Sequence, residues 1–321
     1  MKHPTRRQKK HTKKAYRIRN WREYERALQR RGDLTLWLSE DAIRAWRQRG
    51  PRRPGGQTVY SRTAIEAALT VRVVYSLGLR QTEGFLRSVC RMLSLSLPIP
   101  DHTTLSRRAA KLGRLRMRPR DVSGPIHLLV DSTGVRVHAG NMTVAPRNRS
   151  WRKLHLAVDA VTGDIAAAEL TGRRVHDSQP VPKLLGKVTE GLASFSADGA
   201  YDQQSVYEAV ASHAAARGRG VPRILVPPCR PAQLIAVPTN AVRQRNRNLR
   251  SIRRGGRRRW HRASAYSRRN LVETAMFRFK HIVGRGLRAR SMAGQRAEAV
   301  LGCRTLNRMT ALGMPDSVLV A

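Results

Sequence analysis

Residues 126–137, I-H-L-L-V-D-S-T-G-V-R-V, are the part of the chain from which its architecture can be inferred. Aliphatic and β-branched residues dominate this run, which predicts a β-strand. Two further strand-like runs follow at 151–158, where polar and apolar residues alternate, and at 165–170. Turn residues such as Thr162 and Gly163 separate the last two runs. The three runs are therefore predicted to form an antiparallel meander.

Beyond the meander, predicted helices and strands alternate along the chain. The predicted elements are a helix at 182–188, a strand at 193–197, a helix at 203–215 and a strand at 223–226. Three strands followed by alternating helix and strand predict an α/β core. Residues 227–264 have no usable apolar period, and helices are predicted again at 267–283 and 295–311.

The region before the strands, residues 21–120, has the apolar spacing of helices. Helices are predicted at 21–30, 41–47, 62–77, 81–93 and 102–112, with a Gly/Pro/Arg linker at 49–57. Asp101 is placed to cap the last of these helices. The polar residues expected to be exposed on that helix are Thr103, Thr104, Ser106, Arg107 and Arg108. This arrangement is compatible with a helix-turn-helix DNA reader and also with any small helical bundle that has a basic face.

The chain carries a formal net charge of +42 over 321 residues. A surface this positive repels itself unless a polyanion neutralises it, and nucleic acid is the expected polyanion. Residues 2–19 are mostly Lys, Arg and His, which predicts either a flexible arm that binds phosphates or a disordered solubilising tail. The hydrophobic content of 40% is enough for a folded core and excludes a wholly disordered chain.

The cysteines and the apolar segments indicate the compartment. Cys90, Cys229 and Cys303 are far apart, which excludes a zinc site made of cysteines alone and argues against a disulfide framework. The basic N-terminus lacks the apolar stretch of a signal peptide. The longest apolar stretch, 64–79, is interrupted by charges and predicts a core helix. We therefore expect a cytoplasmic protein with no membrane partner.

Three acidic residues are candidates for metal-dependent phosphodiester chemistry. Asp131 follows the apolar residues 128–130, Asp198 follows the predicted strand, and Glu273 lies in a late helix. Cleavage of a phosphodiester needs an activated water and a stabilised leaving oxygen, and two Mg²⁺ ions about 3.5–4 Å apart can serve both purposes. Mg²⁺ prefers carboxylate, phosphate and water ligands. Taken singly, each acid also has a structural explanation, since residues 131–134 would make a sensible turn.

The helix around Glu273 bears on whether this acid is catalytic or structural. Tyr266, Arg269, Glu273 and Lys280 are spaced so that a regular helix places them in one stripe roughly 60° wide. Apolar residues fall mainly on the opposite side of this helix. One face can therefore pack on a sheet while the other presents a metal-binding Glu273 beside phosphate-binding Arg269 and Lys280. An amphipathic helix with an ordinary solvated face would show the same spacing.

The predicted strand at 151–158 also places polar residues on one face. Lys153, His155 and Asp159 share one face by the two-residue period of a strand. We interpret Lys153 and His155 either as residues that face DNA or the metal site, or as core or edge residues. His176 and Asp177 are interpreted as a loop cap or as support for the site from behind.

At these residues the chain resembles the bacterial insertion-sequence transposases of the DDE superfamily, in particular the insertion-sequence-five family. The shared motifs are V-D-S-T-G at 130–134, W-R-K-L-H-L-A-V-D at 151–159, A-D-G-A-Y-D at 197–202 and the Y-x-x-R-x-x-x-E-x-x-x-x-x-x-K signature at 266–280. Segments 20–28 and 306–318 are also similar, so the resemblance covers almost the whole chain.

The resemblance implies a ribonuclease H-like catalytic core, which is a mixed five-stranded sheet flanked by helices, preceded by a helical DNA-binding region. It implies that Asp131, Asp198 and Glu273 hold two Mg²⁺ ions, which Mn²⁺ can replace. The implied reaction is hydrolysis at the ends of the element, followed by direct transesterification into target DNA. No covalent protein–DNA intermediate is needed, so Tyr266 would support the substrate without attacking it. The implied partners are double-stranded DNA, namely terminal repeats and target, and a second protomer in a synaptic complex.

The expected organisation has five parts. They are a basic arm (1–20), a helical DNA-binding region (21–120), the first part of the catalytic core (121–227), an Arg-rich insertion (228–264) and the C-terminal helices of the core (265–314). The insertion holds ten arginines between residues 243 and 262. Arg257, Arg258 and Trp260 are candidate DNA contacts within it. Trp260 either stacks on an unpaired base or anchors the insertion to the core.

Three other functions fit parts of the pattern. A transposase that has lost catalysis and only binds DNA would share the charge, but the intact acids oppose it. A metal-dependent nuclease or junction resolvase would cut without joining, and the Tyr/Arg/Glu/Lys signature favours transposition over that. A ribosome-associated basic protein is seldom this long with such a core. We therefore expect a bacterial DNA transposase located at the nucleoid.

Overall fold

The computed structural model of the chain describes residues 15–50, 55, 58–112, 117, 124–137, 151–229 and 231–320. Most of the expected basic arm and part of the linker at 49–57 therefore lie outside the described residues. Within the described residues, no helix is both long enough and apolar enough to cross a membrane.

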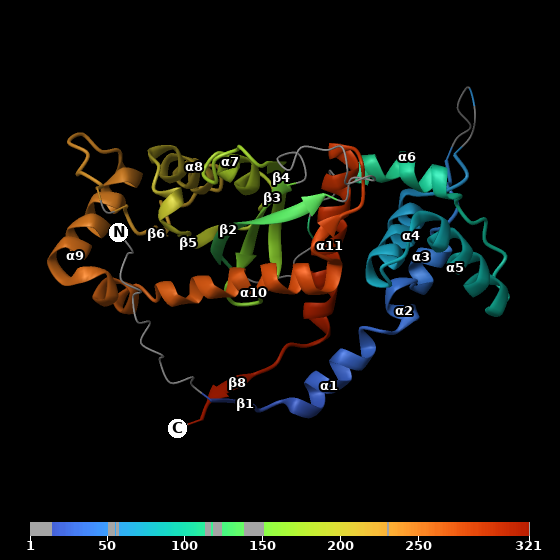
Figure 1. Cartoon of the computed structure of the whole chain (residues 1–321). Coiled ribbons are helices and arrows are strands. Elements are labelled where there is room, and N and C mark those ends of the chain that lie inside the picture. The colour runs from blue at the N-terminus through green and yellow to red at the C-terminus, as the bar shows by residue number, and fades with distance from the viewer. Residues whose placement is uncertain are drawn as a thin grey trace, which may run out of the picture.

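A mixed sheet forms the centre of the molecule (Figure 1). Its strands are β2 (Ile126–Val137), β3 (Trp151–Asp159), β4 (Ile165–Gly172), β5 (Leu192–Ser196) and β6 (Arg223–Leu225), in the order β4-β3-β2-β5-β6. β2, β3 and β4 are antiparallel, which confirms the predicted meander, whereas β5 and β6 run parallel to β2. A short sixth strand that was not predicted, β7 (Gly286–Leu287), pairs with the far end of β2.

Helices cover both faces of this sheet (Figure 1). α7 (Val181–Leu185) and α8 (Gln204–Ala215) lie on one face, and α10 (Asn270–Arg278) and α11 (Met292–Leu312) lie on the other. The pleat of β2 divides its residues between two cores: Leu128 and Val130 pack with the α7 and α8 side, and Leu129 packs with the α10 and α11 side. By the same alternation Asp131 belongs to the α10 side of the sheet.

Among the described residues, six helices precede the sheet. They are α1 (Trp21–Arg30), α2 (Leu34–Trp37), α3 (Glu40–Arg44), α4 (Arg62–Val74), α5 (Leu79–Met92) and α6 (His102–Leu112). Asp101 caps α6 as predicted, since its carboxylate accepts the Thr104 amide at 2.9 Å. α4 ends three residues earlier than predicted, and a left-handed Ser76 (φ 53°) follows it. α4 and α6 pack against α11, which joins the helical region to the sheet.

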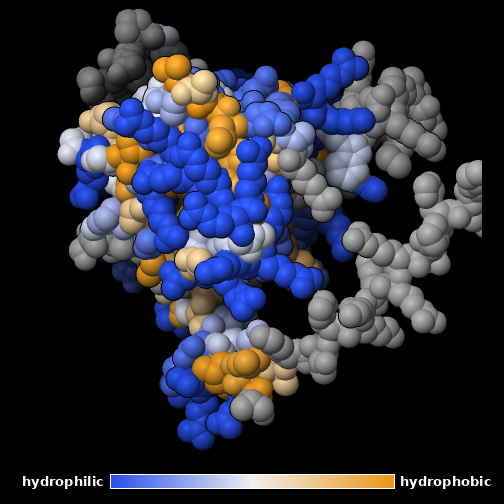
Figure 2. Space-filling view, turned by 90° about the vertical axis from the view of Figure 1, so that its left-hand side faces the viewer, coloured by the Kyte–Doolittle hydropathy of each residue, from blue (hydrophilic) through white to orange (hydrophobic). Residues whose placement is uncertain are grey.

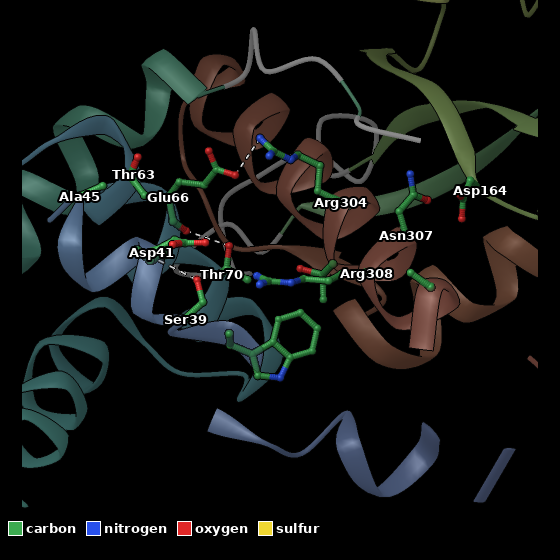
Figure 3. Close-up of a pocket in the computed structure, with 15 residues that line it drawn as sticks. Ser39, Asp41, Ala45, Thr63, Glu66, Thr70, Asp164, Arg304, Asn307 and Arg308 are labelled. Carbon is green, nitrogen blue, oxygen red and sulfur yellow. Dashed lines mark hydrogen bonds and ion pairs between the residues drawn. The ribbon is translucent and has the colours of Figure 1, made fainter. Parts of the chain in front are cut away.

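A cleft of about 620 Å³ lies between α3, α4 and α11, beside the contact of α4 with α11 (Figure 3). Its walls have opposite charges: Asp41 and Glu66 stand on one side, and Arg304 and Arg308 stand on the other. An ion pair of 2.7 Å between Glu66 and Arg304 crosses it. The junction between the helical region and the core is thus open to solvent here and is bridged by an ion pair.

The two ends of the described chain meet in a small separate sheet. β1 (Tyr16–Ile18) pairs antiparallel with β8 (Ser317–Leu319). Neither strand was predicted, because three residues are too few to show a two-residue period. A two-stranded sheet is marginal by itself, and here the Asn20 side-chain amide supports it by donating to the Met314 carbonyl at 3.0 Å.

The Arg-rich segment differs most from its prediction. Residues expected to lack regular structure form one long helix, α9 (Asn240–Ala263), which is kinked at Gly256 (φ 76°). The buried positions are Ala241, Val242, Arg245, Asn246, Leu249 and Trp260. Their spacing is helical, but two of the buried side chains are polar. The apolar residues alone therefore do not show the helical period.

Candidate active site

The three predicted acids lie on three different elements that meet on one side of the sheet. Asp131 lies in β2, Asp198 directly follows β5, and Glu273 lies in the first turn of α10. In the parallel register of β2 and β5, Leu129 lies opposite Ser196. Each aspartate is two residues beyond its register partner, so Asp131 and Asp198 lie level on neighbouring strands that are about 4.8 Å apart.

Arg269 joins two of the three acids. Its guanidinium donates to Asp131 Oδ2 at 2.6 Å and to Glu273 Oε1 at 2.5 Å. Three-quarters or more of the Arg269 and Asp131 side chains is buried, whereas the Glu273 side chain is 52% exposed. Because Arg269 reaches both carboxylates, β2 and α10 are held together at this point.

Tyr266 connects the third acid, Asp198, to the part of the site that contains Arg269. Its hydroxyl donates to the Ala197 carbonyl at 3.1 Å, immediately before Asp198. The Asp198 carboxylate itself caps the 3₁₀ turn η2 (Gly199–Tyr201) by accepting the Ala200 amide at 2.9 Å. The Arg269 guanidinium also lies 5.9 Å from the centre of the Tyr266 ring. Tyr266 and Arg269 therefore contact the surroundings of all three acids.

Several influences act in opposite directions on the pKa of Asp131. The pKa of Asp131 is raised, first by burial and also by the nearby charge of Asp198, although the Ser132 amide and Arg269 pull it down. Burial also raises the pKa of the Tyr266 hydroxyl to about 12. Tyr266 is thus a neutral hydrogen-bond donor at physiological pH, which agrees with its expected supporting position.

The residues of the site fit a hard divalent cation by type. Mg²⁺ and Mn²⁺ prefer carboxylate oxygens, and Asp131, Asp198 and Glu273 supply three carboxylates from neighbouring elements. A cationic guanidinium already stands between Asp131 and Glu273 in the position of a charge partner. Among the residues that the structure describes, no three His, Cys, Asp or Glu side chains are close enough to grip one ion together. A divalent ion would therefore compete with Arg269 for these two carboxylates.

A second layer of polar residues supports Asp131 from behind. The Ser132 hydroxyl donates to Asp177 Oδ1 at 2.8 Å, and the Lys153 ammonium donates to the same oxygen at 2.9 Å. Lys153 also donates to the Val175 carbonyl at 2.9 Å. Lys153 thus has a structural position next to the site. A core or edge position was one of the two predicted interpretations, and contact with DNA or the metal site was the other. Asp177 supports the site, as one of its two interpretations proposed.

His155 was predicted as a DNA contact or a core residue, and the structure places it in the core. It is 0% exposed and cannot reach a ligand. Its Nε2 lies 2.8 Å from the Thr171 hydroxyl. Burial lowers the pKa of His155 to about 4. The strand period correctly grouped His155 with Lys153, but it could not show that β4 pairs with β3 and makes β3 an inner strand.

The buried His155 makes stability depend on pH. The unfolded imidazole titrates near 6.5 and the folded one near 4, so the unfolded chain binds more protons between these values. Its contribution is complete above pH 6.5 and is lost as the pH falls towards 4, about 3 kcal/mol in all. Urea denaturation from pH 7 to pH 4 measures the loss. In His155→Gln the curve should be flatter over this window, and an unchanged slope would contradict the assignment.

The remaining predicted DNA contacts are divided between buried and exposed places. Trp260 is 5% exposed, packs 5.4 Å from the Tyr266 ring and cannot stack on a base, so it anchors α9 to the core. Arg257 donates to the Pro228 carbonyl, and Arg108 donates to the Tyr60 carbonyl. Arg107 and Arg258 are exposed, Lys280 is half-buried, and Thr104, expected on the surface, is buried.

The motif around Glu273 is not one regular helix. Tyr266 and Arg269 lie in a 3₁₀ turn, η3 (Tyr266–Arg269), and Lys280 lies in a π-helical turn, η4 (Phe279–Val283). The stripe predicted from a constant 100° per residue therefore holds for Arg269 and Glu273, which are four residues apart and in contact. Its extension to Lys280 assumed a regular helix that the structure does not have.

Asp202 and Arg245 form a buried pair beside the site, and no function was predicted for either of them. Arg245 Nε lies 2.8 Å from Asp202 Oδ1, and its Nη2 lies 3.1 Å from Oδ2. The pair joins α9 to the residues that follow η2. Asp202 closes the A-D-G-A-Y-D motif, but no local signal indicated its partner 43 residues away.

Comparison with known proteins identifies the class of this domain. Two family profiles, both described as a transposase DDE domain, match residues 29–140 and 122–308. The second covers more than half of the chain. The chain therefore belongs to the DDE transposase domain family. Among solved structures, it is similar to the "Drosophila P element transposase strand transfer complex", at 13% identity and a TM-score of 0.28, over 64% of this chain and 47% of that chain. This chain thus spans about half the length of that one.

Proposed function

We propose that this protein is the DNA transposase of a bacterial insertion sequence of the insertion-sequence-five family. It cuts at the ends of the element and joins the freed 3′-OH groups to target DNA by direct transesterification. The observation that carries the proposal is the convergence on Arg269: Asp131 and Glu273 both contact its guanidinium, and Asp198 lies level with Asp131. We place the protein in the bacterial cytoplasm at the nucleoid, acting as a dimer on DNA.

The strand order supports a ribonuclease H-like core. The first three strands are antiparallel, and the next two add in parallel on the other side of the first strand. The first aspartate lies on the first strand of the sheet, the second follows the fourth strand, and the glutamate lies on a later helix. Residues far apart in sequence are thereby brought to one side of the sheet, as the proposed chemistry requires.

Asp131, Asp198 and Glu273 are proposed to hold the divalent metal, Mg²⁺ in two ions with Mn²⁺ able to replace it. When bound, the metal supplies charge to stabilise the phosphate oxygens and acidify a nucleophilic hydroxyl. If the metal takes over these carboxylates, the Arg269 guanidinium can donate to a phosphate oxygen. Tyr266 holds the backbone next to Asp198 and keeps that acid in place.

The surface of α9 supports a DNA partner. Its exposed arginines Arg243, Arg247, Arg250 and Arg254 recur at intervals of three or four residues, which places them on one face. They line two clefts of about 640 and 440 Å³. Within the described part of the chain, the side chains of these four arginines make no ion pair or hydrogen bond. Figure 2 shows that this end of the molecule is covered mainly by hydrophilic residues, and its arginines suit a phosphate backbone.

The affinity for DNA should fall as the salt concentration rises, with a slope that increases with the number of phosphates contacted. For six to ten contacts, affinity falls by about 10³ to 10⁵ between 50 and 200 mM salt. We expect Arg247→Ala/Arg250→Ala to lower the slope of log Kobs against log salt by about 2. The measurement is a titration of fluorescent duplex DNA at several salt concentrations.

The matched control for that titration is Arg44→Ala/Arg87→Ala. Both of these arginines are exposed but are already paired with acids of their own helices. Because both are already paired, their removal should lower the slope less than the α9 double variant does. A slope that falls equally in both double variants would assign the effect to overall charge and would remove α9 from the proposed contact surface.

The decisive assay for the proposed function uses the DNA that flanks the coding sequence of this protein. The purified protein is incubated with that duplex, a supercoiled target and Mg²⁺, and cleaved ends and joined products are separated on gels. We expect both products with Mg²⁺ or Mn²⁺ and neither with EDTA. Cleavage without joining would indicate a nuclease, and binding without cleavage would indicate a DNA-binding protein; either result contradicts transposition.

A further inference from the structure

An exposed phenylalanine lies beside the candidate active site. Phe277 on α10 is 65% exposed, the highest fraction of any aromatic side chain among the described residues. Phe195 and Phe279 are completely buried by comparison. A large apolar ring in water is a normal isolated feature of protein surfaces, so its position and surroundings decide whether it has a function.

The position of Phe277 relates it directly to Glu273. The two residues are four apart on α10, so they share one face of the helix with their Cβ atoms about 5–6 Å apart. The Glu273 side chain is 52% exposed, so this face opens to solvent at the acid itself. The Phe277 ring therefore borders the open side of the site.

The ring of Phe277 is held by a second ring. The His281 imidazole lies 5.2 Å from it, centroid to centroid, at an interplanar angle of 18°. His281 covers one face of the phenyl ring, while the high exposure of Phe277 leaves the opposite face to solvent. A fixed, flat and half-covered ring is a preorganised surface for stacking.

The surroundings of Phe277 favour a nucleic acid over a protein. The next exposed apolar side chain on α10, Leu271, is six residues away and therefore on another side of the helix. Protein interfaces need a continuous apolar patch around an aromatic anchor, and a single ring does not provide one. Arg269 and Lys280 lie on the two sides of Phe277 along the chain, and cations interleaved with an aromatic ring are typical of single-strand binding.

We propose that Phe277, braced by His281, is the stacking platform for an unpaired base of the DNA strand at the carboxylates. This assignment rests on the proposed function of the site. Trp260, the other aromatic considered for base stacking, is buried and unavailable. Every base has a π face, so the platform accepts a frayed end of any sequence.

The test uses a duplex whose last two bases at one 3′ end are unpaired, with 2-aminopurine as the terminal base. Binding and fluorescence are measured in EDTA, so that no cleavage occurs. On the parent protein we expect quenching of the probe. Phe277→Leu should lose this quenching and bind the frayed duplex about 5- to 150-fold more weakly, the loss of one base stacked on an aromatic ring. Its affinity for a fully paired blunt duplex should change less than about twofold.

Two control variants keep the test sharp. Phe277→Trp should retain quenching and preference for the frayed end, because a larger ring fills the same place. Leu271→Ala removes an exposed apolar side chain of the same helix on another side and should behave as the parent. Quenching that persists in Phe277→Leu overturns the proposal. The proposal is also overturned if Phe277→Leu changes the oligomeric state of the protein while the quenching persists.

The outcome is separable from that of the proposed function. A protein that cuts and joins DNA but shows no quenching dependent on Phe277 refutes the platform alone. A protein that quenches the probe through Phe277 but never cuts refutes the catalytic assignment and leaves the platform standing. A protein that binds neither duplex refutes both.

Discussion

Asp131→Asn is expected to abolish DNA cleavage and strand joining while the protein still folds and binds DNA. Asparagine keeps the size of the side chain but removes the charge that a hard cation requires. Stabilisation of phosphate charge by metal amounts to several kcal/mol, and each 1.36 kcal/mol is a factor of ten. The rate should therefore fall by about 10³-fold or more, measured as single-turnover cleavage of end-labelled DNA.

The same substitution also changes the ground state of the site. It removes the ion pair with Arg269, which is 2.6 Å long and mostly buried. A loss of folding would make the activity result uninformative, so thermal unfolding and affinity for duplex DNA are measured in parallel. Glu273→Gln offers an independent variant, because this side chain is more exposed and its loss should disturb folding less. We expect the same loss of cleavage in both.

The control for charge alone is Asp41→Asn. Asp41 is exposed on α3 and pairs with Arg44 at the surface, so its removal changes the net charge by the same amount. Cleavage by this variant should match the parent within about twofold. If Asp131→Asn cuts and joins at the parental rate, Asp131 is not a metal ligand and the assignment of the site fails.

Local sequence patterns were sufficient for the sheet and for the places of the three acids. The apolar run of β2 and the alternation in β3 gave the meander, because side chains along a strand point alternately to the two faces of a sheet. The positions of Asp131, Asp198 and Glu273 followed from the predicted elements. Their convergence could be expected only from the resemblance, since no local pattern encodes the register between β2 and β5.

Contacts between distant elements account for the errors. α9 was missed because Arg245 and Asn246 occupy buried positions and bond to residues elsewhere. His155 lies on an inner strand because β4 pairs with β3 at that level, and the register Glu169 to His155 cannot be read from either strand alone. Trp260 was recognised as an anchor or a stacking residue, and only its packing on Tyr266 distinguished the two.

Breaking the buried pair of Asp202 and Arg245 should lower stability more than any other single polar substitution near the site. The Asp202 and Arg245 side chains are 2% and 11% exposed, and both carboxylate oxygens accept from the guanidinium. Asp202→Ala leaves the Arg245 charge buried without its partner. Breaking a buried pair in this way costs about 3–5 kcal/mol, which urea denaturation would measure as a lower midpoint.

A double variant separates a stranded charge from lost packing. Asp202→Ala/Arg245→Met removes both charges and fills the space with an apolar side chain, and paired replacements of this kind are often close to neutral. We expect it to be more stable than Asp202→Ala alone. If the double variant is as unstable as the single one, packing around the pair would be responsible.

The pair should also affect the site. Asp202 lies four residues after Asp198 and connects the end of η2 to α9. In Asp202→Ala, the proposed DNA-binding face of α9 is no longer fixed relative to the carboxylates, so cleavage should fall further than the folded fraction does. In the double variant cleavage should stay low even where stability returns, because methionine restores the volume of the contact but not the two directional hydrogen bonds that hold α9 against the core.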